Sequence, residues 1–244
     1  MAHARDNYLL AQLTEAEFEK FHPHLELRSL SKGEVLVRVN QIGRHVYFPI
    51  GAVVSICIEL EDGYSVENTM VGKSGMVGLT SSGQPSFYTA KVKDAGFAYR
   101  MRVPDYLAIR EHCPSFMIAH RGSLVASARH LHFAAVCGKH HSVEQQIIRW
   151  LLNNLDRSMS NVITTTQQEL SELLGFSREF ITVVLGRLSI QGLILIARGQ
   201  LEVPDRTSLE ERSCECYWLA RGLSRPLFTA LLGSPPPHIH NKHA

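Results

Sequence analysis

The chain has 244 residues, of which 45% are hydrophobic, and this length suits two domains that each bury a core. It contains no run of about 18 apolar residues and its N-terminus is too polar for a signal peptide, so we expect a cytoplasmic protein without membrane contact. The net charge is only +2, and residues 138–244 hold eleven Lys and Arg against ten Asp and Glu. Nucleic-acid binding would therefore need a local motif.

The cysteines are odd in number and scattered along the chain. They are Cys57, Cys113, Cys137, Cys214 and Cys216. This arrangement argues against a disulfide framework, and a cytoplasmic location would keep the thiols reduced.

The N-terminal half begins with a predicted helix over residues 7–22, in which Thr14 and Glu17 form a capping box. Between residues 27 and 101 the pattern changes to short apolar runs separated by glycines. The expected strands are 34–39, 45–49, 53–60, 65–71, 89–92 and 97–101. Asp62-Gly63 predicts a two-residue hairpin turn. We expect a β-sandwich or β-roll, and assign residues 1–113 to this domain.

A long helix is predicted over residues 114–137. Six residues along it recur at alternating spacings of four and three, which would place them in one seam of the helix. They are Met117, Arg121, Leu124, Ala128, Leu131 and Ala135. The seam fits either a dimerisation helix or a helix packed on its own β-domain. Gly138-Lys139-His140-His141 is expected to interrupt the helix and to mark a domain boundary, followed by a helix capped by Ser142.

Residues 164–203 have the pattern of a winged helix-turn-helix within a domain of residues 138–233. Thr166 and Glu169 form a capping box for a first helix, Gly175 permits a tight turn, and Ser177 caps a second helix that ends near Ile190. Strands over 193–197 and 200–203 would flank a wing turn at Arg198-Gly199. Residues 234–244 have no pattern that could bury a core, and we expect them to be disordered.

The exposed face of the second helix suits the reading of DNA bases. Arg178 can bind guanine through two hydrogen bonds, and Glu179 can accept one from cytosine. Ser177 and Thr182 are candidates for phosphate contacts, as is the helix N-terminus itself. We include Thr166, Val183 and the wing residue Arg198 in this predicted DNA surface. A plain helical hairpin is the other interpretation of the helix pair.

These motifs resemble those of the Crp/Fnr family of bacterial transcription regulators. The resemblance rests on Leu-Gly-Phe-Ser-Arg-Glu at 174–179, with Thr-Thr-Gln-Gln-Glu-Leu before it and Gln-Gly-Leu-Ile after it. Residues 33–36, 46–51 and 75–78 also fall where that family has β-roll motifs. The resemblance implies an α+β protein, with a cyclic-nucleotide-binding-like jelly roll, a long dimerisation helix and a C-terminal winged helix-turn-helix.

As partners the resemblance implies double-stranded DNA with a palindromic site, a second copy of the chain and RNA polymerase. Arg178 and Glu179 match the base-reading pair of the family's recognition helix. A further family arginine would fall at Val183, which can touch a thymine methyl but cannot read guanine. We therefore expect an operator that differs from the family's best-known sequence.

The effector is not identified by the sequence. The candidate pocket residues are Gly78, Leu79, Tyr88 and Thr89. Family members that bind cyclic nucleotides have an arginine where this chain has Tyr88, and a glutamate for which Gly78-Leu79-Thr80 offers no equivalent. A buried phosphate without its cation is costly, so we predict no tight binding of cyclic AMP. The lack of cysteines before Cys57 argues against an iron-sulfur cluster, whereas haem remains open.

Histidines and cysteines leave the question of metal binding open, and we assign no metal site. The candidates are His130, His132, His140, His141 and the pair Cys214 and Cys216, which lacks a second ligand pair. Cys137 is either a redox-active or an inert buried thiol, and His238, His240 and His243 lie in the tail. Motifs of hydrolases, phosphate loops and metalloproteases are missing, so we expect no enzyme and no catalytic residues. The alternative function is a ligand-, haem- or metal-sensing module whose C-terminal domain contacts proteins instead of DNA.

Overall fold

The computed structural model describes residues 3–61, 65–78, 84–158 and 160–222. The chain forms two compact units, which are Met1–Ser127 with Asn154–Ser160 and Ala128–Asn153 with Asn161–Ala244. No helix among the described residues is both long and apolar enough to cross a lipid bilayer. The predicted disorder of residues 234–244 lies outside the described residues.

The N-terminal helical segment is split, and the prediction of one helix over 7–22 is wrong. It consists of the elements η1 (Ala4–Asp6), α1 (Tyr8–Ala11), α2 (Glu15–Phe21) and η2 (His22–His24). Thr14 has an extended backbone, and its side chain and that of Glu17 each accept a hydrogen bond from the other residue's backbone N–H. A capping box marks the start of a new helix, and here α2 starts at it after α1 has already ended at Ala11.

Two antiparallel sheets form most of the N-terminal unit. The first has the strand order β1-β7-β3, with β1 at Glu26–Leu30, β7 at Gly96–Arg102 and β3 at His45–Pro49. The second has the order β2-β6-β4-β5, with β2 at Val35–Val37, β6 at Thr89–Asp94, β4 at Val53–Glu59 and β5 at Ser65–Val71. The sequence did not predict β1, because only Leu30 of its five residues is buried and no apolar run marks it.

The two sheets share one apolar core, as expected of a sandwich or roll. Leu30, Tyr47 and Ala98 from the first sheet lie in the same buried cluster as Val54 and Val92 from the second. The predicted turn Asp62-Gly63 lies outside the described residues, but the strands on either side of it pair antiparallel with β4 against β5. The predicted β-rich N-terminal domain is confirmed.

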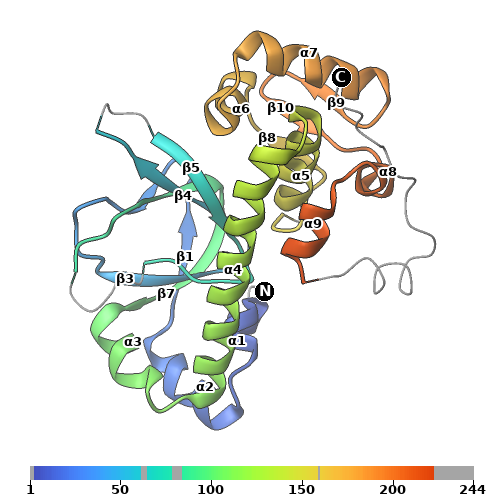
Figure 1. Cartoon of the computed structure of the whole chain (residues 1–244). Helices are drawn as coiled ribbons and strands as arrows, with labels where there is room; N and C mark the ends of the chain where they lie inside the picture. Colours follow the sequence, from blue (N-terminus) through green and yellow to red (C-terminus); the bar gives the residue numbers. More distant parts are fainter. Residues whose placement is uncertain (1–2, 62–64, 79–83, 159, 223–244) are drawn as a thin grey trace. The chain divides into compact units, whose positions relative to one another are not determined.

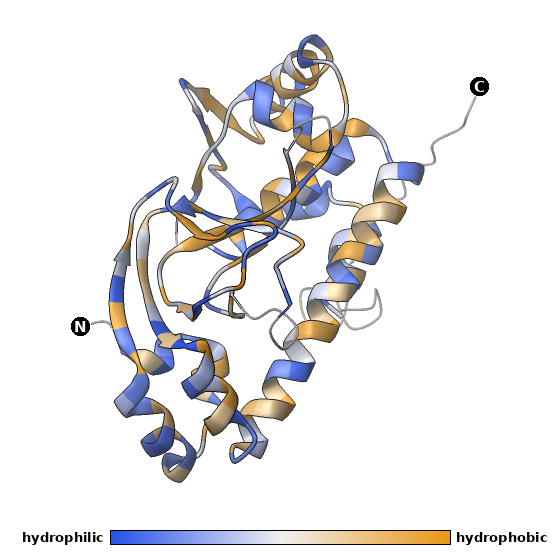
Figure 2. Ribbon diagram, turned by 90° about the vertical axis from the view of Figure 1, so that its left-hand side faces the viewer, coloured by the Kyte–Doolittle hydropathy of each residue, from blue (hydrophilic) through white to orange (hydrophobic). Residues whose placement is uncertain are grey.

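After the sheets, α3 (Val103–Arg110) leads to α4 (Pro114–His140), a continuous helix of 27 residues (Figure 1). The predicted interruption at residues 138–141 occurs at the end of that segment, because α4 runs through Gly138 to His140 and α5 (Val143–Leu155) starts after Ser142. Glycine within a helix costs only about 1 kcal/mol, which neighbouring turns can offset. Apolar and polar residues are interspersed along the whole of α4 (Figure 2).

The C-terminal unit is built on α5 and a small sheet. Its further elements are β8 (Val162–Thr164), α6 (Gln167–Leu174), α7 (Arg178–Ile190), β9 (Leu195–Ala197), β10 (Gln200–Glu202), α8 (Arg206–Glu211) and α9 (Glu215–Ala220). The sheet has the order β8-β10-β9. The predicted cap at Ser142 is confirmed by reciprocal hydrogen bonds with Gln145. Strand β8 and helices α8 and α9 were not predicted from the sequence.

Candidate nucleic-acid interface

The two helices α6 and α7 are joined by a tight turn that the sequence dictates. Thr166 and Glu169 cap α6 reciprocally, with distances of 2.9 and 3.1 Å. Gly175 ends α6 with a φ of 73°, a left-handed conformation that favours glycine. Ser177 then caps α7 by accepting a hydrogen bond from the Phe180 N–H at 3.2 Å. The predicted helix-turn-helix is confirmed.

Helix α7 has one buried and one exposed face. Its buried residues are Ile181, Val184, Leu185 and Leu188. Burial of such side chains contributes roughly 1.5–3 kcal/mol each, so this face fixes α7 to its unit. Arg178, Glu179, Thr182 and Val183 are exposed, and Val183 retains half of its accessible surface. In the part of the chain that the structure describes, neither the Arg178 guanidinium nor the Glu179 carboxylate has a partner.

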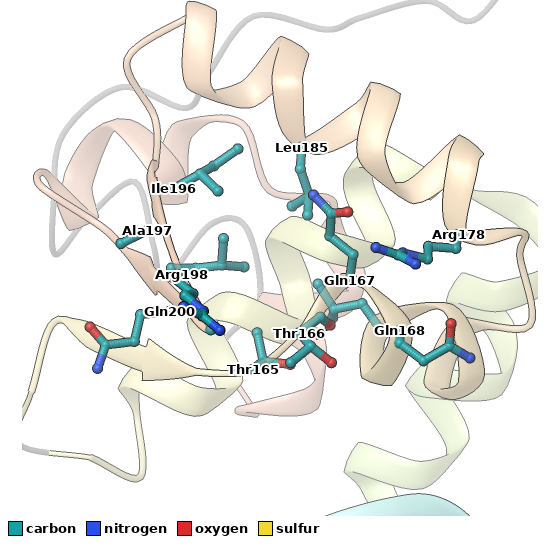
Figure 3. Close-up of a pocket in the computed structure, with 13 residues that line it drawn as sticks. Thr165, Thr166, Gln167, Gln168, Arg178, Leu185, Ile196, Ala197, Arg198 and Gln200 are labelled. Carbon is teal, nitrogen blue, oxygen red and sulfur yellow. Dashed lines mark hydrogen bonds between the residues drawn. The ribbon is translucent and has the colours of Figure 1, made fainter.

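A hollow of about 250 Å³ lies beside this exposed tip, between α6, α7 and the β9–β10 hairpin. Figure 3 shows Arg178 and Arg198 approaching the hollow from opposite sides, with Gln167 and Thr166 between them. Arg198 lies in the turn of the hairpin, where Gly199 has a φ of 71°. Two guanidinium groups on either side of a solvent-open hollow can receive an anionic partner such as a phosphate backbone.

The predicted phosphate contacts differ in how free their hydroxyl groups are. Thr166 and Ser177 accept backbone hydrogen bonds as helix caps, so each hydroxyl proton can still be donated to a ligand. The Thr182 hydroxyl lies 2.8 Å from both the Gln167 side-chain oxygen and the Arg178 carbonyl. Thr182 therefore connects α7 to α6 within the protein, which makes it a weaker phosphate donor than we expected from the sequence.

In the N-terminal unit the structure brings together three of the four predicted effector-pocket residues, while Leu79 lies outside the described residues. Burial raises the pKa of Tyr88, and a hydrogen bond from the Gly78 backbone opposes this shift. The Thr89 hydroxyl donates to the carboxylate of Glu59 and accepts the Val39 N–H at 3.2 Å. The Glu59 carboxylate therefore lies beside one of the predicted effector-pocket residues.

Only part of the predicted seam of α4 is exposed to solvent. Met117 packs against the apolar core of the N-terminal unit. Arg121, Leu124, Ala128 and Ala135 are exposed, and Leu131 is half-buried. Leu124 retains 56% of its accessible surface, and its neighbour Val125 retains 60%. The exposed row of α4 thus begins one turn after the predicted start of the seam.

Among the metal candidates, the structure supplies the second ligand pair that the sequence did not show. Cys137 and His141 lie together with Cys214 and Cys216 in the C-terminal unit. Hydrogen bonds from the Cys214 and Cys216 thiols lower the pKa of Cys137, and the nearby Arg149 guanidinium also lowers it. The missed signal is a Cys-x-x-x-His spacing at the end of one helix combined with the Cys-x-Cys spacing. His132 is instead hydrogen-bonded to the Ala128 carbonyl at 2.7 Å.

Comparisons with known proteins find a matching family model for the helix-turn-helix and solved structures that share the fold of the chain. Residues 145–212 match the family model of the Crp-like helix-turn-helix domain. FixK2 of Bradyrhizobium japonicum is similar at 15% identity with a TM-score of 0.65, covering 78% of this chain and 98% of its own. The c-di-GMP responsive global regulator CLP of Xanthomonas campestris has 18% identity, a TM-score of 0.62 and coverage of 78% and 99%. No curated protein sequence matches the chain.

A third solved structure is that of TTHB099 from Thermus thermophilus, described as a transcriptional regulator of the CRP family. It has 19% identity and a TM-score of 0.61, and the match covers 75% of this chain and 94% of that one. At these identities the solved structures establish the fold, while the domain model identifies the helix-turn-helix segment.

Proposed function

We propose that this chain is a transcription regulator of the Crp/Fnr family that binds a palindromic DNA site as a homodimer, on the basis of its Crp-like helix-turn-helix domain and its fold. The observation that carries the proposal is the exposed tip of α7, where the Arg178 and Glu179 side chains have no partner among the described residues while the opposite face of the helix is buried. This is the arrangement of a recognition helix, whose N-terminal residues contact base edges in the major groove.

The residues around this tip would contact different parts of the DNA, according to their side-chain chemistry. Arg178 would read guanine and Glu179 the cytosine amino group, while the exposed Val183 would contact a thymine methyl. Arg198 on the wing, together with the caps Thr166 and Ser177, would bind phosphates and set the register on the duplex. Since bulk charge is nearly neutral, these local contacts supply most of the affinity.

The homodimer is supported by the exposed apolar row of α4. Ile118, Leu124 and Val125 retain 72%, 56% and 60% of their accessible surface. A helix that exposes such residues at near-heptad spacing is well suited to pack against its own copy. Two copies related by a twofold axis would present two recognition helices to two inverted half-sites.

The effector of the N-terminal unit is, in this proposal, a ligand other than cyclic AMP. The Glu59 carboxylate that accepts the Thr89 hydrogen bond would repel a cyclic phosphate, and Tyr88 carries no charge to offset it. Neither an iron-sulfur cluster nor haem is assigned. We place the protein in the cytoplasm, where a DNA-binding regulator would also meet RNA polymerase.

The proposal is tested by selecting binding sites from a pool of random duplexes with the full chain. We expect enrichment of a motif made of two inverted half-sites about one helical turn apart, each containing a G·C pair. Failure to enrich any motif would support the alternative in which the C-terminal unit contacts proteins. Enrichment of a single, asymmetric site would contradict the homodimer.

A further inference from the structure

Four side chains that bind soft metal ions converge in the C-terminal unit, away from the candidate DNA surface. Cys137 lies in the last turn of α4 and His141 directly follows the helix, and their four-residue separation brings them to the same side of its end. Cys214 caps α9 and Cys216 lies in its first turn. The three thiols are buried and packed against Phe133, and His141 is half-buried. The ligand atoms all lie within 4.8 Å of one another.

The separations match those around one tetrahedral ion. With Zn–S bonds of about 2.3 Å and Zn–N bonds of about 2.0–2.1 Å, tetrahedral angles place two sulfurs roughly 3.8 Å apart and a sulfur and a nitrogen roughly 3.6 Å apart. The Cys137 and Cys214 sulfurs are 3.7 Å apart, and the Cys216 sulfur lies 3.6 Å from His141 Nδ1. Even the widest pair would have to close by only about 1 Å.

The surroundings of the four ligands also suit a metal ion. His141 directs Nδ1 to the cluster, and its Nε2 lies 3.4 Å from the Glu215 carboxylate. A carboxylate on the far nitrogen is the usual way to orient a metal-binding imidazole and to raise its basicity. Zn²⁺ with three thiolates and a neutral imidazole carries one net negative charge, which the Arg149 guanidinium beside Cys137 would offset.

We propose that Cys137, His141, Cys214 and Cys216 form a structural zinc site that binds α9 to the end of α4. Three thiolates and one imidazole in a closed tetrahedral set select Zn²⁺ and leave no open position for catalysis. On binding, the three thiols release three protons to solvent and no atom is oxidised or reduced. The bound ion would stabilise the C-terminal unit, because the unfolded chain has no preformed site.

A disulfide between Cys137 and Cys214 explains the convergence of these side chains less completely than a zinc site does. It would require the two sulfurs to approach from 3.7 Å to about 2.05 Å, and it gives no role to Cys216, His141 or Glu215. The zinc site uses all five residues.

The first test measures metal in the full chain purified without a histidine tag and without chelators. We expect one zinc ion per chain in the wild type, and the same in Cys113→Ser, which alters a buried thiol of the other unit. Replacing His238, His240 and His243 of the tail together by alanine should also leave one zinc. Cys216→Ser and His141→Ala should each reduce the zinc content to near zero.

A second measurement on the unaltered protein covers the case in which these variants do not fold. Metal-stripped protein titrated with Co²⁺ should show the intense visible bands of tetrahedral cobalt and a thiolate-to-cobalt charge-transfer band, saturating at one ion per chain. Weak octahedral bands would overturn the proposal. So would iron or copper in place of zinc, metal-free protein with five reactive thiols, a Cys137–Cys214 disulfide in a peptide map, or zinc lost only when the tail histidines are replaced.

Discussion

In the C-terminal unit, Arg178 lies exposed at the tip of a helix, with a second arginine across a solvent-open hollow. In the N-terminal unit, a carboxylate lies beside the predicted effector pocket, since Thr89 donates its hydroxyl proton to Glu59. Of the two predicted ligand sites, as far as the structure describes them, one presents arginine side chains and the other a carboxylate. We therefore expect the two sites to take different ligands, because a fold does not determine a ligand and binding depends on the charges at the site.

The largest expected effect is on the dissociation constant of the proposed dimer, which would present two recognition helices to the DNA. Leu124→Asp would place two carboxylates face to face in the interface, and like charges there cost several kcal/mol, so the dimer dissociation constant should rise by roughly 100-fold or more. Sedimentation equilibrium measures this change. Ile42→Asp is the matched control, since Ile42 is similarly exposed at 61% and lies outside α4. A dimer that survives Leu124→Asp would place the interface elsewhere.

The next effect concerns the free arginine itself. Arg178→Ala should cost about 1–3 kcal/mol of DNA affinity per protomer, which is roughly 5- to 150-fold, when binding to a selected duplex is followed by fluorescence anisotropy at fixed salt. Arg187→Ala is the control, because nine residues further along α7 a side chain points to the opposite side of the helix. Equal losses in both variants would show a general charge effect in place of a specific contact.

Many structural features of both units could be predicted from the sequence where local signals were strong. The capping boxes at Thr14 and Thr166, the turn at Gly175 and the short runs that form β3 and β5 are all short-range features, and all were found in the structure. Two kinds of feature could not be predicted. Strand β1 lacks an apolar run, and the partners of Thr89 and Cys214 are residues distant in sequence that only the tertiary fold brings together.

A smaller effect should follow from removing the cap that positions the helix pair. Thr166→Ala leaves the Glu169 N–H without its acceptor and should lower the free energy of unfolding by about 1 kcal/mol in a urea titration. Thr207→Ala, an exposed threonine within α8, should leave stability nearly unchanged. If Thr166→Ala were also neutral, the cap would contribute nothing to the order of the DNA surface.

The smallest signal is expected in the N-terminal unit. Calorimetric titration of the full chain with cyclic AMP should give no binding heat, because Glu59 and Tyr88 provide no cation for the phosphate. Micromolar affinity for cyclic AMP would contradict the expectation that only the C-terminal unit binds phosphate-bearing ligands. Binding that appeared only in Glu59→Gln would instead sharpen it, by showing that one carboxylate excludes the nucleotide.

The central claim is that the tip of α7 reads DNA sequence, and a scan of base-pair substitutions in the selected site tests it most directly. Each position of a half-site is replaced in turn, and the affinities of the wild type and of Arg178→Ala are compared. We predict that the variant loses discrimination at one G·C pair in each half-site and retains it elsewhere. Identical discrimination by the two proteins at every position, or equal affinity for all sequences, would contradict direct reading by Arg178.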